Sequence, residues 1–205
     1  MLTQIEQNLL NESCRKSPQA IELELEKSYA VNMAAMVLDF QLTQKIACKA
    51  HKHFKGRFDS CGHHELRSFA ESFADKPDGD ALLAKELWGY SYSERAKYLR
   101  VLLQQFEQRG VTDQSTLENW VANADFERDV KGKFKSGRLS IGFTMFQYLR
   151  LRMGHDTVKP DSRVLDFIKR EIGRSVKPVE AVKSLEQAAL EVGRRAREID
   201  KAIYG

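Results

Sequence analysis

The sequence predicts an all-α protein, and three observations support this fold class. Apolar residues recur at steps of three and four along most of the 205 residues, which is the spacing of one face of an α-helix. No segment of useful length alternates apolar and polar residues as a half-buried strand would. Glycine, proline and polar clusters interrupt the helical pattern where helices commonly end. We expect about ten helices, with no repeat and no low-complexity tract.

In the first half of the chain, helices are predicted between turn-forming residues. Ser17-Pro18 is expected to start a helix that runs to residue 25, and an Ala- and Met-rich helix follows over 29–40. This helix is expected to continue over 41–54 and to end near Gly56. Further helices are predicted over 64–74, over 81–88 with Gly89 as the stop, and from Ser91 or Ser93 to Gly110.

The second half repeats this pattern. Thr112 or Ser115 is expected to cap a helix that carries Leu117 and Trp120, and residues 125–134 are expected to form another. The remaining predicted helices are 144–153, closed by Gly154; 164–172, capped by Asp161 or Ser162 and stopped by Gly173; and one or two helices over 179–204, around Gly193.

Length and composition indicate a soluble globular protein. A chain of 205 residues with 42% hydrophobic and 30% charged residues can bury a real core, as one domain or as two lobes around a cleft. No run reaches the roughly 18 apolar residues of a membrane span, and residues 1–6 lack the features of a signal peptide. We therefore expect no membrane partner and a cytoplasmic location, nucleoid-associated if the source is bacterial.

The cysteines and histidines do not predict a metal centre. Cys14, Cys48 and Cys61 are odd in number and widely spaced, which favours reduced thiols over disulfides, structural zinc or an iron–sulfur cluster. His51 and His53 are two residues apart and do not share a helix face, and His63-His64 are adjacent in a loop-like segment. We expect surface histidines, no metal site and no cofactor.

Positive charge is concentrated in one part of the chain. The formal net charge is only +4, but residues 131–174 hold eleven Lys or Arg against four Asp or Glu. That segment carries +7 and the rest of the chain −3. A basic stripe is often only a solvated surface, yet it also fits nucleic-acid binding.

Two neighbouring features within this basic segment can carry chemistry. The turn Leu139-Ser140-Ile141-Gly142 opens an apolar helix, and backbone N–H groups at a helix start can bind phosphate. Asp161 lies seventeen residues after Thr144, in the run Lys159-Pro160-Asp161-Ser162-Arg163. A carboxylate held there can act on a bound nucleotide as an acid or base. Together they favour a DNA-processing enzyme.

The order of several segments resembles that of the helix-hairpin-helix (HhH-GPD) DNA glycosylases, over roughly residues 29–205. An Ala-rich helix leads into Gln41-Leu42-Thr43, and Gly89-Tyr90 precedes Arg95-Ala96-Lys97. The 139–144 turn and the run around Asp161 follow, and 197–204 closes the chain. The resemblance lies in this sequential agreement, since no single segment is a sharp pattern.

The resemblance implies a two-lobed helical fold that binds duplex DNA across a cleft and removes a damaged base. The lobes would be about 30–154, with the hairpin near 139–144, and about 1–29 with 155–205. Asp161 matches the family's catalytic aspartate, with Ser162-Arg163 in place of Thr-His. The predicted DNA-binding residues are Gln41, Leu42, Thr43, Arg138, Leu139, Ser140, Ile141, Gly142, Thr144 and Arg163. Tyr29, Met33, Trp88 and Tyr90 are candidate walls of a base pocket.

Departures from the family pattern restrict the predicted activity. Bifunctional members carry a lysine in the hairpin helix, where this chain has Phe143, Thr144 and Met145. We therefore expect no lyase activity and a cluster-less, monofunctional type. Ser140 replaces the first hairpin glycine and restricts the backbone more. The basic insert 131–137 has no counterpart in the family.

Each site residue also has a purely structural interpretation. Asp161 fits an ordinary helix N-cap, a role compatible with catalysis. Asp156-Thr157 imitates the family's Asp-Thr but reads as a loop, and remains a second candidate for the acid. Gln41 and Thr43 fit the end or start of a helix. The candidate pocket residues, taken singly, fit a hydrophobic core.

We predict a monomeric, monofunctional DNA glycosylase that flips a damaged or modified base and hydrolyses its N-glycosidic bond. The alternative is a catalytically inactive DNA-binding relative that recognises distorted DNA. A third hypothesis is a helical interaction protein with no nucleic-acid role, for which DNA affinity would be absent or insensitive to salt. The sequence does not identify the excised base, because pocket shape decides that choice.

Overall fold

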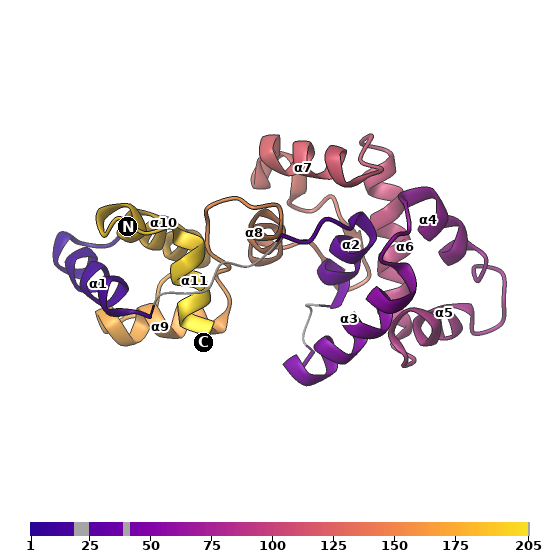
Figure 1. Ribbon diagram of the computed structural model, residues 1–205, viewed down its shortest axis with the longest axis horizontal. Coiled ribbons are helices and arrows are strands. Elements are labelled where there is room, and N and C mark those ends of the chain that lie inside the picture. Colours follow the sequence, from indigo (N-terminus) through magenta and orange to yellow (C-terminus); the bar gives the residue numbers. More distant parts are fainter. Residues whose placement is uncertain (19–24, 39–41, 205) are drawn as a thin grey trace. The chain divides into compact units, whose positions relative to one another are not determined.

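The computed structural model describes residues 1–18, 25–38 and 42–204. The described residues are helical apart from turns and one short two-stranded hairpin, which confirms the predicted all-α class. The chain forms two compact units, coloured along the sequence in Figure 1. Unit 1 comprises residues 1–25 and 142–205, and unit 2 comprises residues 26–141. The two units divide between Ile141 and Gly142, so the helix after the hairpin belongs to unit 1.

Unit 1 is built from both ends of the chain. Its elements are α1 (Gln4–Lys16), α8 (Phe143–Arg152), α9 (Ser162–Ile172), α10 (Pro178–Glu191) and α11 (Ala196–Tyr204). Helix α1 packs against α9 and α10, and Figure 1 shows it beside α10 although more than 150 residues separate them in sequence. Helix α11 packs against both α9 and α10. Residues near the two ends of the sequence therefore share one core.

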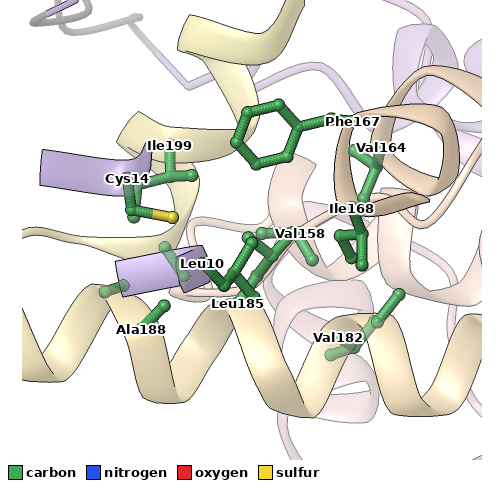
Figure 2. Close-up of a cluster of buried hydrophobic side chains, with 13 residues drawn as sticks. Leu10, Cys14, Val158, Val164, Phe167, Ile168, Val182, Leu185, Ala188 and Ile199 are labelled. Carbon is green, nitrogen blue, oxygen red and sulfur yellow. The ribbon is translucent and has the colours of Figure 1, made fainter. Parts of the chain in front are cut away.

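The core of unit 1 is an apolar cluster to which four helices contribute (Figure 2). Leu10 from α1, Ile168 from α9, Leu185 from α10 and Ile199 from α11 are all fully buried. Cys14 also lies in this cluster, and burial raises the pKa of its thiol to about 12. All three cysteines are free thiols.

Helix α1 was not predicted, and Ser17, where another helix was expected to start, is the C-cap of α1. The chain signals α1 locally: the hydroxyl of Thr3 accepts from the Glu6 N–H, and the carboxylate of Glu6 accepts from the Thr3 N–H. This reciprocal capping box is a sequence-level mark of a helix start. The rest of the predicted helix, residues 19–24, lies outside the described residues.

Unit 2 contains six helices, one turn of π-helix and the hairpin among its described residues. The helices are α2 (Tyr29–Leu38), α3 (Gln44–Phe58), α4 (His63–Glu71), α5 (Gly79–Trp88), α6 (Ser93–Glu107) and α7 (Gln114–Asn123). The π-helical turn is η1 (Phe126–Val130), and the hairpin strands are β1 (Lys135–Ser136) and β2 (Leu139–Ser140). Aromatic rings fill its core, including Phe54 stacked on Trp88 with centroids 5.4 Å apart.

Helix boundaries in unit 2 differ from the prediction at two places. The expected continuous helix over 29–54 is two helices: α2 ends at Leu38, and α3 begins after its N-cap Thr43. Helix α3 also runs through Gly56 to Phe58, because a glycine weakens a helix interior without forbidding it. Gly89 ends α5 in the left-handed conformation (φ 77°), as expected.

A helix was expected over 125–134, but only one π-helical turn forms there, and a β-hairpin follows it before α8. Asp125 caps η1 through the N–H of Arg128, but the helical turns stop at Val130. Lys135 pairs with Ser140 and Ser136 with Leu139 in an antiparallel ladder. Gly137 takes φ +59° in the two-residue turn between the strands, a conformation that favours glycine. Strand β2 (Leu139–Ser140) therefore leads directly into α8 through Ile141 and Gly142.

Among the described residues, no helix has the length and apolarity to cross a bilayer.

Candidate functional site

The candidate site lies in unit 1, on the loop that joins α8 to α9. The N–H of Asp161 donates to the carbonyl of Lys159 at 2.8 Å, so the chain turns tightly around Pro160. The hydroxyl of Thr144, in the first turn of α8, donates to the carbonyl of Pro160 at 3.2 Å. The start of α8 and the start of α9 therefore meet at this loop. Two features that the sequence placed seventeen residues apart are adjacent in space.

Asp161 is the N-cap of α9, as predicted. Its Oδ1 accepts from the N–H groups of Arg163 at 3.0 Å and Val164 at 3.4 Å. Such bonds satisfy helix-start donors and stabilise a helix by about 0.5–2 kcal/mol. Its Oδ2 accepts from the hydroxyl of Tyr204, and the side chain remains 24% exposed. The helix cap therefore holds Oδ1 of Asp161, and Oδ2 is held by the hydroxyl of Tyr204.

Helix α11 contributes two residues that the sequence analysis missed. Asp200 and Tyr204 lie four residues apart, one turn along the same face, and both reach the 159–161 loop. Oδ1 of Asp200 accepts from the N–H of Lys159 at 2.7 Å. The sequence did contain a sign of this role: Asp200 occupies a position on the apolar face of α11, next to the buried Ile199.

Asp200 is a buried carboxyl group. Only 9% of the residue is exposed, and desolvation raises its pKa to about 7. The nearby charge of Asp161 raises the pKa further, whereas the hydrogen bond from the Lys159 N–H and the charge of Lys159 oppose the shift. Two carboxyl groups in different environments thus face one loop.

Lys159 brings a largely buried cation to the same place. Its Nζ lies 3.8 Å from Oδ2 of Asp161 and 4.4 Å from the ring centroid of Tyr148 on α8. Its side chain is only 12% exposed. A cation over an aromatic face is attracted by the ring quadrupole. Arg163, which is exposed, lies 4.8 Å from the ring centroid of Tyr204.

The start of α8 has the features of an anion-binding helix end. Gly142 is the N-cap, with extended backbone and no side-chain cap, and nothing lies within 4 Å of a Cβ built on it. The first N–H groups of α8 therefore lack a capping side chain, and anions favour such positions. Within unit 1, the structure brings together the predicted residues Gly142, Thr144, Asp161 and Arg163.

The other predicted DNA-binding residues belong to unit 2. Arg138 is exposed at the turn of the hairpin, Leu139 and Ser140 form β2, and Ile141 is buried. Leu42 is half-buried and Thr43 is exposed before α3, while Gln41 lies outside the described residues.

Three of the four candidate pocket residues lie in the core of unit 2. Met33 is fully buried, Trp88 is 1% exposed, and Tyr29 is 4% exposed. The hydroxyl of Tyr29 bonds Nδ1 of His63 at 2.9 Å. Tyr90 is half-buried, with its ring edge-on to Tyr92 at 4.8 Å. These positions agree with the core interpretation for Tyr29, Met33 and Trp88.

His63 corrects the expectation of surface histidines. It begins α4 and is only 4% exposed, because helix formation turns its ring inward against Tyr29. Burial lowers the pKa of its imidazole. Among the described residues, no three His, Cys, Asp or Glu side chains form a group that could hold a metal ion.

Asp156 has a structural role. Its Oδ1 accepts from the N–H of Arg197 at 3.1 Å, next to the start of α11. The neighbouring Thr157 is buried and donates to the side-chain oxygen of Gln147 at 3.0 Å. This Asp-Thr pair therefore fastens the α8–α9 loop at its first half, and Asp161 fastens it at the second.

Fold and site together define a mostly helical protein. Its candidate site is the loop before α9, which carries Asp161 and is hydrogen-bonded to the start of α8. The chain belongs to the family described as a domain of unknown function, DUF8548, whose model matches residues 94–205. That range includes the hairpin, the 159–161 loop, and Asp200 and Tyr204 of α11. No curated protein sequence matches the chain significantly.

A solved structure that resembles the chain is that of the 8-oxoguanine DNA glycosylase of Thermotoga maritima. The two share 16% sequence identity with a TM-score of 0.47. The match covers 98% of this chain and 86% of that one.

Proposed function

We propose that the protein is a monofunctional DNA N-glycosylase in which Asp161 is the acidic catalyst. The observation that carries the proposal is the position of Asp161: a partly exposed carboxylate on a loop that is hydrogen-bonded to the first turn of α8. A helix start suited to phosphate and a carboxylate suited to sugar chemistry thus lie side by side in one unit. The family-like order of segments supports the same interpretation.

The chemistry requires an anion beside the sugar. Cleavage of an N-glycosidic bond builds positive charge on the sugar ring, which a fixed carboxylate stabilises in the transition state. In this proposal, Oδ1 of Asp161 is held by the N–H groups of Arg163 and Val164, and Oδ2 acts on the sugar or on the attacking water. The hydroxyl of Tyr204, which donates to Oδ2, orients that oxygen before substrate binds.

Phosphate groups on either side of the flipped nucleotide would be held by the basic segment. Within unit 1, the proposed contacts are the N–H groups at the start of α8 and the exposed guanidinium group of Arg163. The exposed guanidinium group of Arg138 in unit 2 is a further proposed phosphate contact. Gln41, Leu42 and Thr43 are the proposed wedge that fills the gap left by the base.

Lyase activity is not part of the proposal. The family's lysine position is taken by Phe143, Thr144 and Met145. Lys159 is nevertheless close to Asp161, so it is the amine to examine for a covalent adduct with the sugar. We expect no borohydride-trapped adduct and an abasic site that breaks only after alkali treatment.

The test is a glycosylase screen on duplex oligonucleotides that carry alkylated, deaminated, oxidised or hypermodified bases. Wild type, Asp161→Asn and Asp166→Asn are compared, since Asp166 is an exposed carboxylate on the same helix. Asn can still cap α9, so Asp161→Asn should fold normally. We expect product from wild type and Asp166→Asn, and a loss of at least about 100-fold in Asp161→Asn with DNA affinity retained.

One observation favours a second function, that of a catalytically inactive DNA-binding protein. Both oxygens of Asp161 already have structural partners, namely two helix N–H groups and the hydroxyl of Tyr204. If no base is released and wild type and Asp161→Asn bind duplex DNA alike, with strong salt dependence, this second function replaces the first.

A further inference from the structure

Helix α3 carries an unusual concentration of positive charge. It contains Lys45, Lys49, Lys52, Lys55 and Arg57, and no Asp or Glu. It lies in unit 2 and outside the basic segment 131–174, and it begins directly after Thr43, a member of the proposed wedge. Its charge is therefore not explained by the proposed catalytic site.

The geometry of the helix gathers three of these cations on one line. Lys45, Lys49 and Lys52 are four and three residues apart, so they form a single stripe along α3. The buried face carries Ala50 and Phe54, which pack into the core with α2 and α5. At about 100° per residue the stripe lies on the side away from that face. All three lysines are exposed, and we name them the α3 stripe.

Carboxylates neutralise the end of α3 but not the stripe. Lys55 pairs with Glu26 at 2.7 Å, and Arg57 pairs with Glu86 at 2.8 Å. Among the described residues, no ion pair involves a lysine of the α3 stripe. The acidic side chains among the described residues thus leave a row of uncompensated charge on α3.

This row opposes the stability of α3. Like charges at steps of three and four destabilise a helix by about 0.2–0.5 kcal/mol per pair. Lys45 also lies in the first turn, where the helix dipole disfavours a cation, and that turn contains no acidic residue. The N-cap Thr43 makes no side-chain capping bond that would offset this. The charges of the α3 stripe therefore add no stability to α3. A bound polyanion would remove the repulsion between these lysines.

We propose that the α3 stripe binds the phosphate backbone of duplex DNA as a second contact surface. At 1.5 Å rise per residue the three lysines span about 10 Å, and one strand presents a phosphate roughly every 3.4 Å along the duplex axis. The stripe therefore spans a run of about four phosphates of one strand, which allows one phosphate contact for each of the three lysines. The inference rests on the DNA-binding part of the proposed function, and it does not depend on Asp161 chemistry.

The experiment measures binding of the full chain to an unmodified 20-base-pair duplex as a function of salt. The stripe variant is Lys45→Gln, Lys49→Gln and Lys52→Gln together. The matched control is Lys16→Gln, Lys76→Gln and Lys183→Gln, which removes the same charge from exposed positions outside α3. Each lost phosphate contact should reduce the steepness of log Kobs against log salt by about 0.9, so we expect the stripe variant to lose about 2.7. The control should keep a slope close to wild type.

Three results would overturn the proposal. The first is an equal slope for the stripe and control variants, and the second is the absence of duplex binding by wild type. The third is a stripe variant that loses binding to phosphatidylserine vesicles while its duplex binding is unchanged. Thermal unfolding by circular dichroism should show the stripe variant at least as stable as wild type, since repulsion is removed. The glycosylase screen runs in parallel and separates the two proposals. Product formation with equal slopes rejects the stripe alone, whereas a slope change without product on any base rejects the catalytic function alone.

Discussion

At the scale of single residues, Asp161 and Asp200 show how one residue type takes different roles in different surroundings. Asp161 accepts backbone N–H groups at a helix start and stays partly exposed. Asp200 is buried on α11 and accepts the N–H of Lys159, two residues before Asp161. Both carboxyl groups hold the same loop, so removing either should affect the position of the other.

Burial of Asp200 predicts a pH dependence of stability. Its folded-state pKa is about 7, against an ordinary 3.8, so the folded protein binds this proton more tightly than the unfolded chain does. The resulting stability is full below about pH 4 and is lost as the pH rises to about 7. Between pH 4 and 8, wild type should lose about 2–4 kcal/mol relative to Asp200→Asn in urea unfolding.

Asp166→Asn is the control for this measurement, because Asp166 is exposed on α9. Its pH profile should follow that of wild type. Parallel profiles for wild type and Asp200→Asn would mean that Asp200 does not retain its proton in the folded state.

At the scale of elements, the helix ends follow local rules wherever the capping residues are clear. Gly89 and Gly173 end α5 and α9 in the left-handed conformation, and Asp161 begins α9. Errors fall where a helix continues through a glycine, as α3 does, or where the helical turns stop early, as they do after Val130. Propensity is a weak signal there, because tertiary packing decides the outcome.

Two glycines in unit 2, one at the start of α5 and one inside α3, give a matched test of these local rules. A Cβ on Gly79, the first residue of α5, would overlap the carbonyl oxygen of Phe73, whereas nothing lies within 4 Å of a Cβ on Gly56. We expect Gly79→Ala to lower the free energy of unfolding by about 1–3 kcal/mol. Gly56→Ala should raise it by about 0.5–1 kcal/mol, because alanine is the better residue inside a helix. Chemical denaturation would measure both, and a stabilising Gly79→Ala would contradict the described turn before α5.

At the scale of the whole molecule, the two units have different chain connectivity. Unit 2 is one continuous segment, whereas unit 1 needs residues from both ends of the sequence. The 159–161 loop therefore depends on a core that α1 helps to close. A change far from Asp161 in sequence should be felt by the helices around it.

Leu10→Ala and Leu9→Ala on α1 test this dependence. Leu10 is fully buried in the unit 1 core, and Leu9 is 45% exposed. Leu10→Ala should lower the free energy of unfolding by about 2–5 kcal/mol and accelerate amide hydrogen exchange in α9 and α10. Leu9→Ala should change stability by less than about 1 kcal/mol. Unchanged exchange in α9 and α10 for Leu10→Ala would show that α1 is not part of their core.

The sequence alone determined the all-α class and most helix positions, and it limited the N-cap of α9 to Asp161 or Ser162. These features depend on residues within about four positions of one another, through periodicity, capping bonds and glycine conformation. The capping box of α1 belonged to the same class of signal, although it was overlooked.

Only the tertiary structure decided which residues surround Asp161. Asp200 and Tyr204 reach the loop from about forty residues away, and α1 joins α10 across most of the chain. Packing likewise decided that Tyr29, Met33 and Trp88 are core residues. Such contacts depend on how whole helices bury their apolar faces against one another, and helical periodicity shows which face is buried without naming the helix that covers it.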